Sequence, residues 1–144
     1  MSDIATTIRF AVAEDSLSIR SLARRLATSF TIDDDLFDEM FNRLMGDGKA
    51  RILVSTDGEG VANGYLLGFV HEAFFANGVI AWIEEMYVSD SARLKGIGLS
   101  LERAFEAWAR ELDAKLIALA TRRASSFYRA IGYEESAVYF RRLL

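Results

Sequence analysis

The stretch Arg93-Leu94-Lys95-Gly96-Ile97-Gly98 is the most informative part of the chain. It lies between an apolar, strand-like run that ends at Val88 and a helical run over residues 97–112. A strand that turns through glycines into a helix leaves several backbone N–H groups directed at one point, where the helix N-terminus adds a partial positive charge. Glycine also lets the backbone approach a ligand and adopt a positive φ. The stretch is therefore either a phosphate-binding turn or an ordinary strand–helix turn.

Composition narrows the classes of function. The chain has 144 residues, of which 51% are hydrophobic, so we expect one domain over residues 1–144 with a substantial core. It has no cysteine and one histidine, His71, which argues against disulfides, thiol catalysis and a metal centre. The net charge of −4 argues against nucleic acid as a partner. No apolar run approaches the roughly 20 residues of a membrane span, so we expect no membrane partner and a cytoplasmic location.

Hydrophobic periodicity predicts an alternation of strands and helices. Strands are expected at residues 7–13, 51–56, 64–72, 79–88 and 115–120, with two final strands at 133–135 and 137–143. Helices are expected from Asp15 or Ser16, from Thr31, from Ile97 and from Ala124, the last closed by Gly132. Because a helix joins them, the strands ending near Val88 and Ala120 should be parallel. The pattern predicts an α/β fold with a mixed sheet.

This order, together with three motifs, resembles the GNAT superfamily of N-acetyltransferases. Arg93, Gly96 and Gly98 fill the family's Arg/Gln-x-x-Gly-x-Gly/Ala motif. The stretch from Ile83 to Val88 resembles the family's fourth strand, and residues 124–133 resemble its signature Ala-x-x-Phe-Tyr-x-x-x-Gly-Phe/Tyr. Thr121 stands where the family often has Asn, which weakens one expected contact to pantetheine. The resemblance implies a sheet of about seven strands, flanked by about four helices, with strands four and five splayed apart.

The resemblance implies acetyl-CoA as the cosubstrate and no metal. Backbone N–H groups would hold its pyrophosphate, namely those of Leu94, Lys95, Gly96, Ile97, Gly98 and Leu99. The pantetheine arm would pair with free backbone groups at Met86 and Val88, and the amide near Met86 would polarise the thioester carbonyl. Arg93 either assists through its charge or is a surface arginine. Arg129 either reaches a phosphate or is a solvated arginine on a helix face.

Three residues are candidates for proton transfer, two for the base and one for the acid. Glu84 matches the strand-four acid of some family members and is the first choice for the base that deprotonates the amine, with Glu85 second and a water chain as a third possibility. Neighbours on a strand face opposite ways, so only one glutamate should face the cleft unless a bulge intervenes. Alternatively, Glu84 binds the substrate cation or a surface arginine. Tyr128 is the candidate acid for the leaving thiolate, or else a tyrosine that fills the core.

The acceptor is not specified by the sequence. Polyamines, amino acids, aminoglycosides, and protein N-termini or lysines all remain open. Five aromatic residues either line an acceptor pocket or belong to the core: Phe30, Phe37, Phe41, Phe74 and Phe75. The strand around Tyr139 and Phe140 could pair with another copy in a homodimer. The expected function is acetyl transfer from acetyl-CoA to a primary amine of a small molecule or peptide, by direct attack in a ternary complex. The alternative is a catalytically inactive acyl-CoA-binding sensor or assembly module.

Overall fold

The computed structural model describes residues 6–144, in which it contains five strands and four α-helices. Residues 1–5, which the expected domain includes, lie outside the described residues. The strands are β1 (Thr7–Phe10), β2 (Ala50–Thr56), β3 (Ala62–Ala73), β4 (Gly78–Val88) and β5 (Ile117–Leu119). The helices are α1 (Ser16–Leu26), α2 (Asp34–Met45), α3 (Ile97–Glu111) and α4 (Ser125–Ala130).

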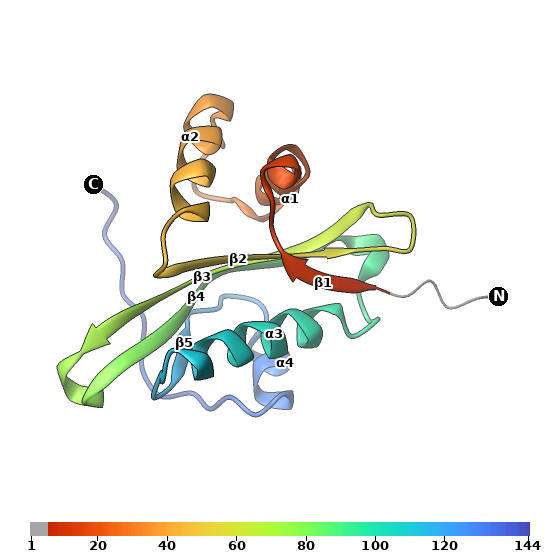
Figure 1. The fold of residues 1–144 in the computed structure, drawn as a ribbon. Coiled ribbons are helices and arrows are strands. Elements are labelled where there is room, and N and C mark those ends of the chain that lie inside the picture. Colours follow the sequence, from red (N-terminus) through yellow and green to blue (C-terminus); the bar gives the residue numbers. More distant parts are fainter. Residues whose placement is uncertain (1–5) are drawn as a thin grey trace.

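All five strands form one mixed sheet in the order β1–β2–β3–β4–β5. Neighbours from β1 to β4 are antiparallel, whereas β5 lies parallel to β4 because α3 carries the chain back across the sheet. Figure 1 shows α1 and α2 over one face of the sheet, with α3 and α4 over the other. The predicted parallel relation of the strands on either side of α3 is therefore confirmed.

The two hairpin turns have local causes. In the first, the Asp57 carboxylate accepts hydrogen bonds from the N–H groups of Glu59 and Val61 at 2.9 and 3.0 Å. Gly60 in the same turn has a φ of 81°. In the second, Asn77 adopts the left-handed conformation with a φ of 55°. Asp, Asn and Gly are the residues that make such turns, which is why both hairpins were predictable.

Each face of the sheet has its own hydrophobic core. Beneath α3 the cluster includes Leu66, Ile83, Leu101 and Phe105, which are at most 3% exposed. On the other face, α1 and α2 pack on Val54 and Tyr65, among others. The apolar stripe of α3 is buried from Ile97 to Trp108, whereas Leu36 and Met40, which continue the apolar pattern of α2, are 61% and 47% exposed. Among the helices of residues 6–144, none is long and apolar enough to cross a bilayer.

The expected seven strands are wrong, because the sheet of the described residues has five. Residues 133–135 and 137–143 were predicted to be strands but have no strand partner. Instead, the Arg141 guanidinium donates a hydrogen bond to the Ser29 hydroxyl at 3.0 Å, in the loop between α1 and α2. Figure 1 shows this segment running past the sheet to the level of α2. Alternating apolar residues favour an extended conformation, but pairing requires a free edge in register.

The start of the second helix differs from the expectation, whereas the first helix starts where it was expected. The second helix begins at Asp34 rather than Thr31, because Asp33 is its N-cap and accepts a hydrogen bond from the N–H of Leu36 at 2.9 Å. α1 begins at Ser16 with Asp15 as its N-cap residue, as expected, but the Asp15 side chain makes no capping hydrogen bond. Its carboxylate instead binds the Arg9 guanidinium at 2.7 Å, which holds the pKa of Asp15 below its usual range.

Candidate active site

The turn between β4 and α3 exposes a row of backbone N–H groups. Gly96 is the N-cap of α3, with a φ of 78°, and no side chain caps the helix. The first backbone bond into the helix is from the N–H of Ser100 to the Gly96 carbonyl, at 3.0 Å. Within residues 6–144, no acceptor binds the N–H groups of residues 94–99. Free N–H groups at a helix N-terminus are the arrangement that an anion site requires.

Two glycines of this turn serve different purposes. Gly96 needs its left-handed backbone, and a Cβ there would meet no atom within 4 Å. A Cβ on Gly98 would lie 3.2 Å from Cζ of Phe127, so Gly98 allows α4 to pack against the first turn of α3. Leu94 also has a positive φ, 65°, and Lys95 beside it is exposed. Ile97 is 2% exposed and anchors the helix start in the core.

Arg93 is held against the turn rather than extended from it. Its Nε donates to the Val88 carbonyl at 3.1 Å, and its Nη1 lies 2.9 Å from the Asp90 carboxylate. The guanidinium also lies over the Tyr87 ring, 5.6 Å from its centroid. The Val88 carbonyl, expected to be free for a ligand, therefore has a partner in this structure. Met86 pairs with Leu66 of β3, and its side chain packs beneath α3.

A bulge in β4 changes which way its glutamates face. Leu67 of β3 pairs with Glu85 and the next residue, Gly68, pairs with Ile83, so Glu84 is left without a partner. Trp82 Nε1 donates to the Glu84 carboxylate at 2.6 Å, which places these two side chains together. An extra residue in one strand reverses the alternation beyond it.

Both glutamates consequently lie on the face that α1 and α2 cover. The Glu85 carboxylate accepts a hydrogen bond from the hydroxyl of Tyr65 at 2.7 Å, and Tyr65 belongs to the core under these helices. Burial and the nearby Glu85 charge raise the pKa of Tyr65 far above its ordinary value. The exception allowed in the sequence argument, an intervening bulge, is therefore present.

The sheet opens immediately beyond this bulge. β4 and β5 pair only from Ala81 with Ile117 to Ile83 with Leu119, whereas β4 continues to Val88. Its last residues therefore have a neighbouring strand on the β3 side alone. Backbone groups on an unpaired edge can bind an extended, amide-containing ligand in the manner of an added strand.

A cavity of about 1380 Å³ adjoins the open end of β4. Its walls come from β4, α3, β5, α4 and the C-terminal segment. Four of the predicted site residues line it together: Glu84, Thr121, Tyr128 and Arg129. The residues of the glycine turn do not line this cavity, so the predicted residues form two neighbouring parts rather than one pocket.

Tyr128 is the buried residue among these four. Its ring packs edge-on against Phe127 and Tyr133, with centroids 5.0 and 5.5 Å away. Burial, followed by the charge of Glu102, raises the pKa of Tyr128 to about 12. The phenol therefore keeps its proton at neutral pH, as a general acid must before it acts. No other group of residues 6–144 forms a hydrogen bond with its hydroxyl.

Thr121 and Arg129 have structural contacts of their own. The Thr121 hydroxyl accepts a hydrogen bond from the N–H of Ala124 at 3.1 Å, which supports the turn into α4. Arg129 forms an ion pair with Glu135, and both side chains are exposed. Arg129 therefore behaves as a surface arginine in this structure, and Thr121 has a structural role in the turn; both residues also line the cavity.

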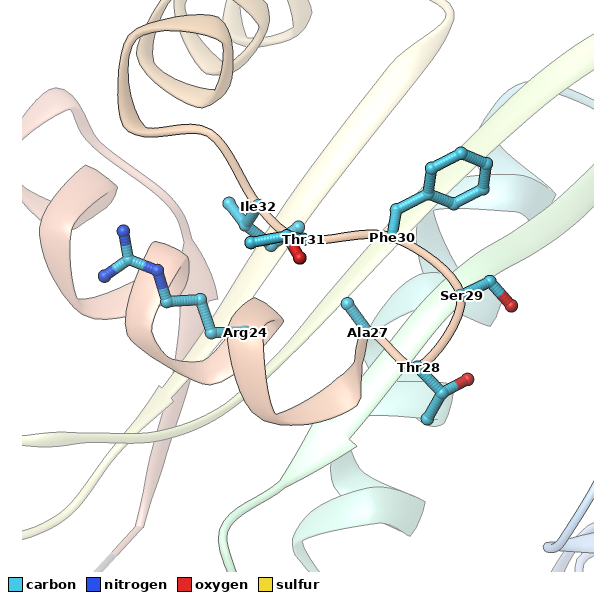
Figure 2. Close-up of a pocket in the computed structure, with 7 residues that line it drawn as sticks. All are labelled: Arg24, Ala27, Thr28, Ser29, Phe30, Thr31 and Ile32. Carbon is cyan, nitrogen blue, oxygen red and sulfur yellow. The ribbon is translucent and has the colours of Figure 1, made fainter.

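Of the five aromatic residues considered for an acceptor pocket, some lie in the core and others on the surface. Phe41 is buried and Phe37 stacks on it, with centroids 5.8 Å apart. Phe30 is 71% exposed and belongs to a smaller pocket of about 380 Å³ in the loop between α1 and α2. Figure 2 shows the Phe30 ring and the Arg24 guanidinium pointing in opposite directions from this pocket. The exposed Phe74 and Phe75 lie at the tip of the β3–β4 hairpin.

Sequence reasoning missed Glu102. This α3 residue is 2% exposed, lines the cavity and accepts a hydrogen bond from the Tyr133 hydroxyl at 2.9 Å. The available signal was its position directly after Leu101, at the border of the apolar stripe of the helix. A charged residue at such a position is seldom fully buried unless it is paired.

Comparison with known proteins identifies the family and the fold of the chain. A model of the acetyltransferase (GNAT) domain matches residues 48–135. No curated protein sequence matches the chain.

Solved structures extend the similarity over almost the whole chain. Glucosamine-6-phosphate N-acetyltransferase from Arabidopsis thaliana superposes with a TM-score of 0.86 at 18% identity, covering 96% of this chain and 98% of that one. An acetyltransferase from Trypanosoma brucei gives 0.83 at 18%, covering 97% and 100%. An aminoglycoside acetyltransferase from an uncultured soil metagenomic sample, in complex with sisomicin, gives 0.80 at 21%, covering 96% of each chain. At these identities the likeness is one of fold.

Proposed function

The chain belongs to the GNAT acetyltransferase family, and from this we propose that it moves an acetyl group from acetyl-CoA to a primary amine of a small molecule or peptide. The observation that carries the proposal is the shared cavity of Glu84 and Tyr128 at the open end of β4. A carboxylate and a protonated phenol on one cavity are the base and the acid that acetyl transfer requires.

The glycine turn suits the cosubstrate's phosphates. The N–H groups of residues 94–99 have no acceptor within the described part of the chain, and Gly96 leaves the space in front of them open. These backbone groups and the N-terminus of α3 would hold the pyrophosphate. The unpaired edge of β4 beyond Ile83 would bind the amides of the pantetheine arm, at Met86 and Val88.

The reaction then needs two proton transfers. Glu84 takes a proton from the ammonium, directly or through water, and the neutral amine attacks the thioester carbon. A backbone N–H near Met86 stabilises the oxyanion that forms. As the carbon–sulfur bond breaks, the Tyr128 hydroxyl gives its proton to the departing sulfur. The new carbon–nitrogen bond completes the amide, and solvent restores the two protonation states.

The acceptor side is proposed to lie on the face of β4 that carries Glu84 and Glu85, near the loop between α1 and α2. Two carboxylates on one face favour a cationic acceptor. The named acetyltransferases of the same fold supply two acceptors worth testing, an amino sugar phosphate and an aminoglycoside.

Calorimetric titration with acetyl-CoA, followed by thiol release across a panel of amines, tests the proposal. The panel contains spermidine, glucosamine-6-phosphate, sisomicin, free amino acids and a short peptide. Binding with thiol release on one class of amine is expected. Binding without release on any of them would support the alternative, an inactive acyl-CoA sensor. Absence of binding would contradict both functions.

A further inference from the structure

A buried carboxyl group that the proposed reaction does not use lies beside Tyr128. Glu102 is on the side of α3 that meets Tyr133, whereas Leu101 and Phe105 of the same helix pack against the sheet. Its side chain is 2% exposed and borders the cavity that Tyr128 also borders. A carboxyl group at such a place is costly unless its oxygens are paired or it carries a proton.

Only one of its two oxygens has a hydrogen bond. Oε1 accepts from the hydroxyl of Tyr133 at 2.9 Å, whereas Oε2 has no hydrogen-bond partner. Arg103 comes within 3.9 Å of Oε2, but it also bonds to Glu106 at 3.1 Å. Burial is the main cause that raises the pKa of Glu102; Glu106 adds to the effect, and Tyr133 and Arg103 oppose it. Glu102 therefore exchanges its proton closer to neutral pH than an ordinary glutamate.

The charge of Glu102 acts on Tyr128 through space. The Tyr133 ring, whose hydroxyl binds Glu102, packs edge-on against the Tyr128 ring at 5.5 Å. No hydrogen bond joins Glu102 to Tyr128 among the described residues. Between buried groups a negative charge is poorly screened, so ionised Glu102 makes the phenol a weaker acid. Neutral Glu102 removes this effect.

We propose that Glu102 is a positioning residue that acts through Tyr128: its charge sets how readily the phenol gives its proton to the departing sulfur. The inference rests on the proposed function, because it requires Tyr128 to be the proton donor. In the transfer, the Tyr128 O–H bond breaks and the S–H bond forms, and Glu102 exchanges no atom with the substrates. Tyr133 keeps the carboxyl group in place through its hydrogen bond to Oε1.

The test compares wild type with Glu102→Gln, which keeps the shape of the side chain and removes its charge. Single-turnover rates are measured at saturating acetyl-CoA and amine over a range of pH. Such rates report the chemical step and not product release. The amine is the one that wild type uses in the panel above. The ratio of the variant's rate to the wild-type rate is plotted against pH, because ionisation of the amine cancels in that ratio.

We expect the ratio to rise about threefold as Glu102 ionises in wild type and then to level off. Glu111→Gln, on the exposed end of the same helix, should keep a ratio near one throughout. Glu102→Leu, which cannot ionise and fits an apolar helix face, should follow the Gln variant. A purely structural role for Glu102 would lower the rate by one factor at every pH, and such a flat ratio would overturn the inference alone. A wild type that acetylates no amine would overturn the proposed function and this inference with it.

Discussion

The two parts of β4, before and after its bulge, have different neighbouring strands. From Gly78 to Ile83 it has β3 on one side, and β5 joins it on the other from Ala81 onward; Ala81 is fully buried and Ile83 is 3% exposed. From Glu84 to Val88 it has β3 alone, and its side chains are exposed or half-buried. We call Gly78–Ile83 the closed half of β4 and Glu84–Val88 the open half. The closed half joins β3 and β5 in one sheet. The open half carries two carboxylates on one face and has one strand edge without a neighbouring strand, which is why the candidate site lies there.

Replacement of Tyr128 by Phe tests whether the chemistry belongs to the cavity beside the open half. The change removes only the hydroxyl, so the proton for the leaving sulfur must come from water. We expect kcat to fall by about 10²–10⁴-fold, with little change in acetyl-CoA affinity. Thiol release and calorimetry measure the two quantities. Unchanged turnover in Tyr128→Phe would remove the acid role.

The two glutamates of the bulge can be separated by parallel substitutions. Glu84 is the exposed residue without a strand partner, whereas Glu85 is bound to the Tyr65 hydroxyl. We expect Glu84→Gln to lower kcat about 100-fold near neutral pH and to alter the pH–rate profile, since the base is lost. Glu85→Gln should have a smaller effect. The reverse order would transfer the role of base to Glu85.

Gly96→Glu tests the turn that follows the open half. The new carboxylate would stand in front of the free N–H groups, and the left-handed backbone disfavours any side chain there. We expect acetyl-CoA to bind about 100-fold more weakly, or not at all, by calorimetry. Gly60→Glu is a matched control, because Gly60 also has a positive φ and open space. Equal affinity in the two variants would show that the phosphates bind elsewhere.

Ile83→Ala places the perturbation in the closed half. The side chain belongs to the core beneath α3, so its removal leaves a cavity. We expect the free energy of unfolding to fall by about 2–5 kcal/mol in denaturant titrations. Acetyl-CoA affinity should stay within a few-fold of wild type. A large loss of acetyl-CoA affinity at unchanged stability would contradict the view that the closed half of β4 stabilises the fold and the open half binds the cosubstrate.

The smallest expected effect is the pH dependence of stability. Burial raises the pKa of Glu102 in the folded chain above its unfolded value near 4.5. The stability that this bound proton contributes is therefore fully present below the pKa of Glu102 in the unfolded chain. It is lost as the pH rises through the pKa of Glu102 in the folded chain. Relative to Glu102→Gln, wild type should lose stability as pH rises. Asp15 has a lowered pKa, so Asp15→Asn should show the opposite slope: wild type loses stability relative to this variant as pH falls.

Sequence alone predicted the elements whose causes are local. The Asp57 and Asn77 turns, the apolar stripe of α3 and the glycines before it all depend on residues close together in the chain. The fold class followed from their order. The two terminal strands were wrong because a strand also needs a partner edge, which no local pattern specifies. The Arg141 side chain instead reaches Ser29, more than a hundred residues away.

The candidate site also contains some features that depend on local sequence and others that depend on distant parts of the chain. Its glycine turn and Tyr128 were predictable from motifs. The bulge that turns Glu84 and Glu85 to one face depends on a pairing shift opposite Gly68, which a single strand does not reveal. A Cβ at Gly68 would lie 2.2 Å from the Phe105 ring, so this glycine provides the room that α3 needs. Burial of Glu102 likewise depends on α4 and Tyr133 covering it.

Backbone amide NMR of the isotope-labelled protein, titrated with acetyl-CoA, tests the central claim most directly. The two halves of β4 and the turn each supply their own resonances. We predict the largest shifts at the amides of residues 94–99 and of the open half, Glu84–Val88. Gly78–Ile83 and the Gly60 turn should move little. Shifts confined to the loop pocket of residues 27–32, or none at saturating acetyl-CoA, would contradict the claim that the open half of β4 and its glycine turn bind the cosubstrate.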